Sequence, residues 1–383
     1  MSRLTRAPLI EVAPPTRSSW RPLPDENVWI LNLDQVESGS GKVLSRQQMK
    51  ARDITSSTVA FDDTNVLYSK LRPNLNKVVL PNTSGYCTSE LLPLKPDPQR
   101  LDRGYLAHYL RSPVFVAWAV SRTDGAKMPR VKMDVLREHL IPLPELAEQR
   151  RIATILDKSD AIRTKRREVL NLADGFLRSV FLDMFGDLFS EKKNEWKKLS
   201  DCTDFIDYRG KTPEKSDNGV RLITAKNVRD GVINIEPAEF ISEATYSWWM
   251  SRGFPLSGDV LFTTEAPLGN VAVLNTQEPV AIGQRLIAIR PREMLRWDYL
   301  SWALRQSIVQ SDILSRSTGS TVKGIRSAEL VQVQIPIPGK DDQLKFEKIV
   351  ASVNHQKSGM QVSAQQGDLL FQSLQHHAFQ GCL

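Results

Sequence analysis

The first segment whose residue types could do chemistry is Val36–Leu44, "VESGSGKVL", which has the look of a phosphate-binding loop. Such a loop needs a glycine five positions before the glycine of its Gly-Lys pair, and a serine or threonine directly after the lysine. Val36 and Val43 occupy those two positions. We therefore expect no nucleotide site here and interpret Ser38–Gly41 as a hairpin turn.

Other candidate catalytic or metal-binding residues also lack the spacing that their chemistry needs. Asp187–Lys193, "DLFSEKK", places an aspartate before a Glu-x-Lys as some nucleases do, but the segment is polar and without a strand pattern, so solvated charge is the simpler interpretation. The five histidines show no metal-ligand spacing with carboxylates. Cys87, Cys202 and Cys382 form no CxxC pair, which favours reduced thiols over zinc or disulfides. The chain also lacks the Asn/Asp-Pro-Pro-aromatic tetrapeptide of amino-methyltransferases and a Gly-x-Gly cofactor loop, so no catalytic residue and no metal is expected.

Composition and charge indicate a multidomain protein with a polyanionic partner. The 383 residues exceed one ordinary core, and 41% hydrophobic with 25% charged residues is typical of a globular protein. No apolar run reaches the roughly 20 residues that a membrane helix needs, and the N-terminus lacks the apolar core of a signal peptide. We therefore expect a cytoplasmic protein without membrane contact. The net charge of +7 and the sequence pI near 9.2 favour nucleic acid only weakly on their own.

An internal repeat supplies the elements that must position any functional residues. Ile141–Leu156, "IPLPELAEQRRIATIL", and Ile335–Val350, "IPIPGKDDQLKFEKIV", share Ile-Pro-aliphatic-Pro and a glutamine, and they begin 194 residues apart. The same offset of 194 relates Asn65–Leu80 to Asp259–Leu274, Gly104–Leu106 to Asp298–Leu300, and Gly125 to Gly319. Several matches at one constant offset predict two copies of a single unit.

Each copy has the same predicted order of elements. Short alternating apolar runs separated by Gly, Pro and Asn indicate strands, and a helical stretch, a glycine loop, the Ile-Pro phrase and a long polar helix follow. The first long helix is expected over about residues 146–185, with Ile155, Ile162, Val169 and Phe176 on one packed stripe. The second, over about residues 341–379, is expected to be interrupted at Gly359 and Gly367.

The expected fold class is α+β. Two repeated mixed α/β domains are separated and joined by two long helices, which form an antiparallel coiled-coil pair that buries the apolar stripes. The boundaries follow from the prolines, which cannot lie inside a helix. We place the first repeated domain at residues 1–144, the first long helix at 145–187, the second repeated domain at 188–338 and the second long helix at 339–383.

These features resemble the specificity subunit of type I restriction-modification systems over nearly the whole chain. The tokens that carry the resemblance are "IPLPELAEQRRIATILDKSDAI" at Ile141–Ile162 with its Pro-x-x-x-x-Gln phrase, "DYRGKTP" at Asp207–Pro213, "VRLITAKNVRDGVI" at Val220–Ile233, "GSTVKGI" at Gly319–Ile325, and "FGD" leading to "EWKKLSD" at Glu195–Asp201. The first copy lacks a Gly-Lys-Thr-Pro equivalent near Pro14–Trp20, and the second phrase retains only Gln343 of the "EQRR" pattern. These departures concern individual contacts.

The resemblance implies a non-catalytic chain that decides where partner enzymes act. The two repeated domains would be target-recognition domains and the two long helices spacer helices. Each recognition domain would read one half of a bipartite double-stranded DNA target in the major groove. The helices would set the gap and dock two modification subunits, which bring S-adenosylmethionine and methylate a flipped adenine; this chain itself would bind no cofactor. Restriction-translocase subunits would join for cleavage. The alternatives are a duplicated scaffold or adaptor that does not read DNA sequence, and an enzyme whose site lacks a familiar motif.

Residues for DNA contact were chosen from the basic and polar residues of the turn-rich loops, because Lys and Arg contact phosphates and Arg, Lys, Asn and Gln read bases. In the second copy they are Arg209, Lys211, Thr212, Arg316, Ser317, Thr318, Ser320, Thr321 and Lys323. In the first copy they are Lys70, Arg72, Lys77, Arg122, Thr123, Lys127 and Arg130. The predicted docking residues for partner subunits are Glu148, Gln149, Arg150, Arg151 and Gln343.

Overall fold

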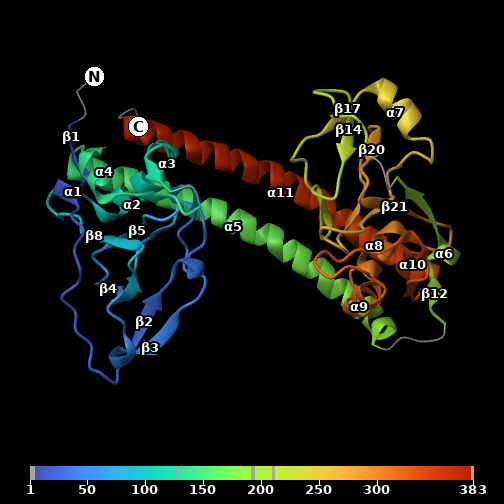
Figure 1. The fold of residues 1–383 in the computed structure, drawn as a ribbon, viewed down its shortest axis with the longest axis horizontal. Helices are drawn as coiled ribbons and strands as arrows, with labels where there is room; N and C mark the ends of the chain where they lie inside the picture. The colour runs from blue at the N-terminus through green and yellow to red at the C-terminus, as the bar shows by residue number, and fades with distance from the viewer. Residues whose placement is uncertain (1–4, 126, 191–194, 209–211, 381–383) are drawn as a thin grey trace. The chain divides into compact units, whose positions relative to one another are not determined.

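The chain folds into two compact units that share two long helices. The computed structural model describes residues 5–125, 127–190, 195–208 and 212–380. Unit 1 comprises Met1–Val169 with Met360–Leu383, and unit 2 comprises Leu170–Gly359. Helix α5 (Leu146–Phe185) and helix α11 (Lys340–Gln380) each contribute one segment to each unit (Figure 1). The predicted α+β fold with two long helices is confirmed.

Unit 1 contains the first copy of the repeat. The elements before α5 are β1 (Arg6–Pro8), α1 (Leu9–Val12), β2 (Asn27–Leu31), η1 (Leu33–Gln35), β3 (Gln47–Lys50), η2 (Ala51–Asp53), β4 (Thr58–Phe61), β5 (Val66–Ser69), η3 (Pro73–Leu75), β6 (Val78–Val79), β7 (Gly85–Thr88), β8 (Leu91–Leu94), α2 (Arg103–Arg111), α3 (Pro113–Val120), β9 (Thr123–Asp124), β10 (Arg130–Val131), α4 (Met133–Glu138) and β11 (Leu140–Pro142). The strands form one sheet of order β3-β2-β7-β4, one of order β6-β5-β8, and the pairs β1-β11 and β9-β10. The predicted turn at Ser38–Gly41 is confirmed, since Val36 and Val43 pair antiparallel across it.

Unit 2 contains the second copy. Its elements are η4 (Gly186–Phe189), β12 (Lys197–Lys198), α6 (Leu199–Cys202), β13 (Thr203–Asp207), β14 (Val220–Ile223), β15 (Val228–Arg229), β16 (Val232–Ile233), β17 (Phe240–Ile241), α7 (Glu243–Trp249), β18 (Val260–Thr263), β19 (Val271–Val273), β20 (Val280–Ile282), β21 (Leu286–Pro291), α8 (Trp297–Leu304), α9 (Ser307–Ser315), α10 (Ser327–Leu330) and β22 (Gln334–Ile335). Its sheets have the orders β13-β21-β18-β19 and β17-β14-β20, with the pairs β12-β22 and β15-β16. The "DLFSEKK" segment begins in η4, and its residues 191–193 lie outside the described residues.

The repeat is visible in the secondary structure and in the hydrogen bonds. Strand β5 at residues 66–69 corresponds to β18 at residues 260–263, again 194 positions later. The buried hydroxyl of Tyr105 donates to the carbonyl of Pro142 at 3.0 Å, and Tyr299 donates to Pro336 at 2.8 Å. Each helical stretch that was predicted as one helix is instead two, α2–α3 and α8–α9. In the first copy the break falls at Ser112, which caps α3 ahead of Pro113 at its first position.

The packed face of α5 is not the predicted stripe. Ile162, Val169 and Phe176 have exposed fractions of 51%, 43% and 54%, so the expectation that this stripe is buried was wrong. In unit 1 the buried face instead carries Ile152 and Leu156, and in unit 2 it carries Leu177, Phe181 and Phe185. Between these two apolar ends the packed face of α5 is polar. A search for regularly spaced apolar residues therefore selects a side of the helix that is exposed.

Arginines occupy the polar part of that face in unit 1. Arg163 Nε donates to Asp368 of α11 at 2.7 Å, and Arg166 Nη1 donates to the carbonyl of Ser363 at 2.9 Å. Rising numbers in α5 meet falling numbers in α11, so the two segments run antiparallel, as predicted. Helix α11 is continuous through Gly359 and Gly367, contrary to the prediction. Gly367 admits the Arg166 guanidinium, which would lie 2.6 Å from a Cβ at that position.

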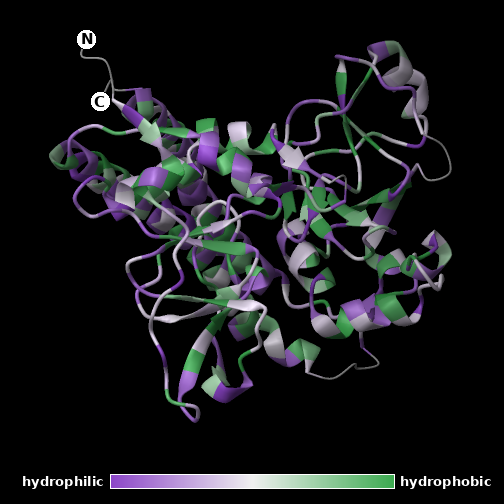
Figure 2. Ribbon diagram, turned by 60° about the vertical axis from the view of Figure 1, so that its left-hand side comes forward, coloured by the Kyte–Doolittle hydropathy of each residue, from purple (hydrophilic) through white to green (hydrophobic). Residues whose placement is uncertain are grey.

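In unit 2 the corresponding helical segments also run antiparallel. Phe181 of α5 packs against Phe346 of α11 with ring centroids 5.4 Å apart, and Lys357 forms an ion pair with Asp174. Figure 2 shows hydrophilic and hydrophobic residues interspersed along the helices. No helix in the described part of the chain has the length and apolar character needed to cross a bilayer.

Candidate nucleic-acid interface

The glycine loop of the second copy presents a polar tip on a tightly closed backbone. Thr318 and Gly324 exchange two backbone hydrogen bonds of 2.8 and 2.9 Å, which close the loop at its base. Gly319 has φ +102°, and a Cβ there would lie 2.1 Å from the Val322 carbonyl oxygen, so the turn requires glycine. The predicted contact residues Ser320, Thr321 and Lys323 are exposed on this tip.

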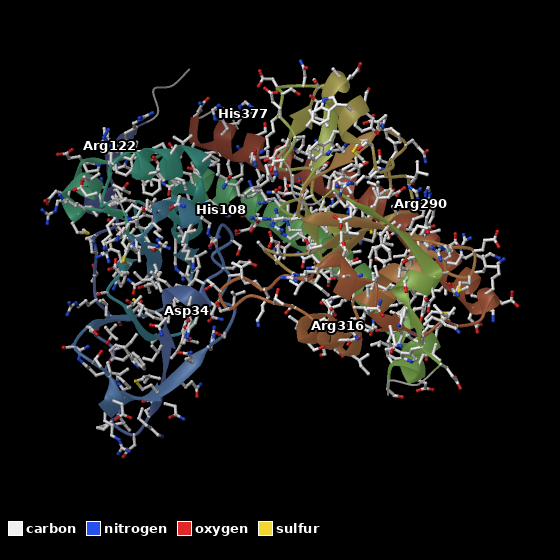
Figure 3. All side chains as sticks on the ribbon, turned by 45° about the vertical axis from the view of Figure 1, so that its right-hand side comes forward. Asp34, His108, Arg122, Arg290, Arg316 and His377 are labelled. Carbon is white, nitrogen blue, oxygen red and sulfur yellow. The ribbon has the colours of Figure 1, made fainter. Side chains whose placement is uncertain are left out.

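Arg316 and Ser317 support the loop from its helical side. Arg316 Nε donates to Asp312 at 3.1 Å, and the Ser317 hydroxyl donates to the Leu314 carbonyl at 2.7 Å. Arg316 extends from the end of α9 (Figure 3), where Glu329 lies 3.5 Å from its Nη1. Both residues are half-buried, so their contacts within the unit compete with a role in binding a ligand.

Two hollows lie side by side on this face of unit 2. The first, of about 590 Å³, is lined by the glycine loop and by Glu265, Gln284, Arg285 and Arg326. The second, of about 250 Å³, is lined by Thr212, Lys215 and again by Gln284 and Arg285. Both loops that the sequence predicted in the second copy therefore border one continuous face. Thr212 is exposed on it, whereas Arg209 and Lys211 lie outside the described residues.

The sequence analysis missed the charged and amide side chains that line the first hollow: Glu265, Gln284, Arg285 and Arg326. Arg285 Nε lies 2.9 Å from Glu265 Oε1, and both side chains are about half exposed. The offset of 194 places Gln284 opposite Glu90, and Arg285 opposite Leu91. A change of charge at matched positions of the shared framework could have found Gln284, Arg285 and Glu265, the last of which corresponds to Leu71. Arg326 corresponds to Lys132 and carries no such signal.

In the first copy the same framework brings most of the predicted residues together. The carbonyl of Lys70 accepts from the N–H of Val131 at 3.1 Å, and Arg72, with φ 49°, donates its N–H to Pro129 at 2.7 Å. These bonds attach the β9–β10 hairpin, with Thr123 and Arg130 in its strands and exposed Lys127 between them, to the segment after β5.

The charged residues of this hairpin have distinct environments. Arg130 contacts Glu90 through Nε and Nη2 at 2.9–3.2 Å, and this hydrogen bonding raises the pKa of the Arg130 guanidinium. Arg122 lies 5.4 Å from the Trp118 ring centroid at the surface of unit 1 (Figure 3). Lys77 is directed elsewhere, since its ammonium donates to the carbonyl of Leu33 at 2.6 Å. It is therefore separate from the hairpin group.

The glutamines of the two repeated phrases are structural anchors. Gln149 is 0% exposed; its Oε1 accepts from the N–H of Asp102 at 2.8 Å, and its Nε2 donates to the carbonyls of Arg100 and Pro144 at 2.9 and 2.8 Å. Gln343 is 1% exposed and makes the equivalent bonds with Arg296, Met294 and Pro338 at 2.8, 3.1 and 3.0 Å. The structure thus buries these two members of the predicted docking set. Their side-chain amides form hydrogen bonds with the backbone of their own unit.

The remaining predicted docking residues lie on the accessible side of α5. Arg150 and Arg151 are exposed, and Arg151 Nη2 lies 2.7 Å from Glu148 Oε1. This hydrogen-bonded arginine lowers the pKa of the Glu148 carboxyl. The three side chains form a charged surface near the start of the helix.

The residues that the structure describes assemble no metal-binding cluster. No three His, Cys, Asp or Glu side chains gather there in a way that could hold a metal ion. The thiols of Cys87 and Cys202 are free and buried, and burial raises their pKa values to about 12 and about 11, which keeps both thiols protonated. Cys382 lies outside the described residues.

The known proteins that this chain resembles in sequence are specificity subunits of type I restriction enzymes. Residues 53–172 match the model of the type I restriction modification DNA specificity domain. The chain is 24% identical over 322 residues to the type I restriction enzyme MjaVIII specificity subunit of Methanocaldococcus jannaschii, covering 79% of this chain and 75% of that protein. It is 26% identical over 179 residues to the EcoDI specificity subunit of Escherichia coli, covering 45% of this chain and only 40% of that protein.

Solved structures share the fold along the whole chain. The S subunit of a type I restriction-modification system from M. genitalium superposes with a TM-score of 0.56 at 16% identity, covering 98% of this chain and 96% of that one. A chain from a study of the assembly and conformational transition of the type I R-M system also gives 0.56, at 20% identity and with coverage of 99% and 98%.

Proposed function

The chain belongs to the family of type I restriction-modification specificity subunits, and from this premise we propose that it selects the DNA target of such a complex. Each copy of the repeat reads one half of a bipartite double-stranded target in the major groove, where every base pair presents a distinct pattern of donors and acceptors. The chain is non-catalytic and supplies sequence readout to enzymes that bind it.

The observation that carries the proposal is a shared framework with divergent exposed residues. The two copies repeat the buried bonds of Gln149 and Gln343, yet matched positions on the loops differ in chemistry. Lys70 corresponds to Thr264, Arg72 to Ala266, Lys127 to Thr321 and Arg130 to Gly324. Two domains with one fold and different contact residues are what two different half-sites require.

The two long helices are proposed to set the gap between half-sites and to dock the modification subunits. In unit 1, Ile162, Val169 and Met360 line an apolar groove of about 340 Å³, bordered by Lys165 and Arg166. In unit 2, Leu172 and Phe176 of α5 are 70% and 54% exposed. Exposed apolar patches of this kind mark protein interfaces.

The proposed partners supply the chemistry that this chain does not. Two modification subunits would bind S-adenosylmethionine and methylate the target, with the charged surface of Glu148, Arg150 and Arg151 as a second contact. Restriction-translocase subunits would join the same complex for cleavage.

The test is selection of duplexes from a randomised pool by the full chain together with its modification subunits. We expect one motif with two specific halves and a fixed gap, and an affinity that falls steeply with salt because phosphate contacts release counterions. Equal binding of all sequences would favour the scaffold alternative and refute sequence readout. Methyl transfer by this chain alone would refute its non-catalytic role.

A further inference from the structure

The turn between β20 and β21 lies between the two loops predicted to contact DNA in the second copy. Gln284 and Arg285 border both the hollow beside the glycine loop and the hollow beside Thr212. Both residues are exposed, while Ile282 and Leu286 on either side of the turn are 0% exposed. The turn therefore projects two polar side chains from strands fixed in the core, which positions them more accurately than a long loop would.

The backbone of this turn is anchored to its neighbours. The N–H of Gly283 donates to the carbonyl of Ile223 at 2.8 Å, and the N–H of Leu286 donates back to Gly283 at 3.1 Å. A Cβ at Gly283 would lie 3.1 Å from Thr224 Cγ2, so the close approach to β14 favours glycine. These contacts hold the turn in place without involving the side chains of Gln284 and Arg285.

Glu265 orients the Arg285 guanidinium. The 2.9 Å contact joins Arg285 Nε to Glu265 Oε1, and the two side chains are 48% and 45% exposed. Glu265 thus contacts the Nε of Arg285. A guanine, by contrast, is bound through its O6 and N7 by the outer nitrogens of an arginine, so the two contacts use different parts of the guanidinium. An arginine held in this way loses less side-chain freedom when it binds than a free one.

The first copy places its charges differently on the same framework. Leu71 pairs with Arg130 as Glu265 pairs with Gly324, and each pair is 194 residues from the other. There the arginine is on the hairpin and its partner Glu90 is at the turn before β8, with Nη2 and Oε1 2.9 Å apart. In the second copy the arginine is on the turn and the acid follows the strand. Between the copies the arginine thus moves from the hairpin to the turn, and the acid moves from the turn to the segment after the strand.

We propose that Gln284 and Arg285 are base-reading residues of the second copy, which rests on the proposed function. Arg285 donates to O6 and N7 of a guanine, Gln284 makes the paired contact to N6 and N7 of an adenine, and Glu265 is the positioning residue of Arg285. The first copy reads its half-site with a different arrangement, through Arg130 on the hairpin.

The experiment compares the base preferences of variants of the full chain, bound to its modification subunits, on randomised duplexes. Arg285→Ala is expected to lower the preference for guanine at one position of one half-site by roughly 5- to 150-fold, the range given by a good bidentate pair. Gln284→Ala lowers the preference for adenine in the same half, and Glu265→Gln weakens the guanine preference at unchanged thermal stability. Arg130→Ala changes only the other half.

Two further variants separate base reading from charge. Arg285→Lys keeps a positive charge but not the planar fork, so it is expected to lose the guanine preference while keeping most of the affinity. The matched control is Arg292→Ala, because Arg292 is also exposed and paired with a carboxylate, Asp204 at 2.6 Å, but follows the opposite end of β21. It should leave every base preference unchanged.

The outcomes are distinguishable. If Arg285→Ala weakens binding by the same factor for all sequences, Arg285 contacts phosphate and the inference is overturned. Unchanged preferences in Arg285→Ala and Gln284→Ala would overturn it as well, while the proposed function would stand. If the unaltered complex itself selects no sequence, the proposed function fails.

Discussion

Removal of the Gln149 side chain is predicted to loosen the junction between helix α5 and the first recognition domain. The amide of Gln149 bonds the backbone N–H of Asp102, the N-cap residue of α2, and the carbonyls of Arg100 and Pro144. In Gln149→Ala the three backbone groups lose these partners. All three bonds are half-buried, so water replaces the lost amide only in part.

The magnitude follows from the bond count. At about 1 kcal/mol net for each of three hydrogen bonds, Gln149→Ala should lower the free energy of unfolding of unit 1 by about 3 kcal/mol. Locally, the N–H of Asp102 loses its 2.8 Å acceptor. If this group becomes unsatisfied at a cost of about 1–3 kcal/mol, its hydrogen exchange should accelerate roughly 5- to 150-fold.

The assay is amide hydrogen exchange at Asp102 and at Arg296, the equivalent N–H in unit 2. Gln149→Ala should accelerate exchange at Asp102 and not at Arg296, and Gln343→Ala should do the reverse, because Gln343 accepts from Arg296 at 2.8 Å. Gln366→Ala, at an exposed position of α11, is the matched control and should change neither. Unchanged protection at Asp102 in Gln149→Ala would refute the anchoring role.

Three other predictions test the packing, the electrostatics and the spacer helix. Phe181→Ala removes a ring that is 0% exposed and should cost about 3–5 kcal/mol in urea denaturation, whereas Phe176→Ala, at a side chain 54% exposed on the same helix, should change stability by no more than about 0.5 kcal/mol. Burial, with Arg122 and Arg6 nearby, lowers the pKa of His139 to about 4. Its neutral form therefore stabilises unit 1 above the unfolded pKa of 6.5, and this contribution is lost as the pH falls toward 4; the fall in urea midpoint from pH 7 to 4 should be smaller in His139→Asn. Insertion of one helical turn within Ile155–Phe176 should change the gap between half-sites and leave both half-site sequences as they were; altered halves at an unaltered gap would contradict the spacer role.

The order of the secondary-structure elements was predicted well because the repeat shows the sequence pattern of each element twice. The predicted ends of α5, residues 146 and 185, are those of the structure. The interruption of α11 was predicted from Gly359 and Gly367, which cost about 1 kcal/mol each in a helix on propensity alone. Tertiary packing overrides that cost at Gly367, where the absence of a side chain makes room for Arg166. The packed face of α5 was also missed because of tertiary packing: arginines, which an apolar pattern does not include, occupy the middle of that face.

The candidate site was predictable in its loops but not in its centre. The turn chemistry around Gly319 and Thr212 is readable from composition, whereas Gln284 and Arg285 follow a buried strand and have only Gly283 beside them as a turn residue. Their position between the two hollows depends on β14 and β20 pairing in parallel, a contact between residues far apart in the sequence. Glu265 likewise gains its partner only when β18 and β21 are brought side by side.

The way the loops are held explains how two copies of one framework can differ in what they read. The bonds that fix the glycine loop and the hairpin are made by backbone atoms: Val131 N–H to the carbonyl of Lys70 at 3.1 Å, and Ile325 N–H to the carbonyl of Thr264 at 3.0 Å. Because a backbone bond does not depend on the side chain that its residue carries, lysine and threonine occupy the same position without altering the fold. The side-chain bonds that both copies repeat, by contrast, belong to tyrosines and glutamines that are identical in both copies. Side chains at the loops are thus free to diverge, while those at the junction with the helices are constrained by the bonds that they make.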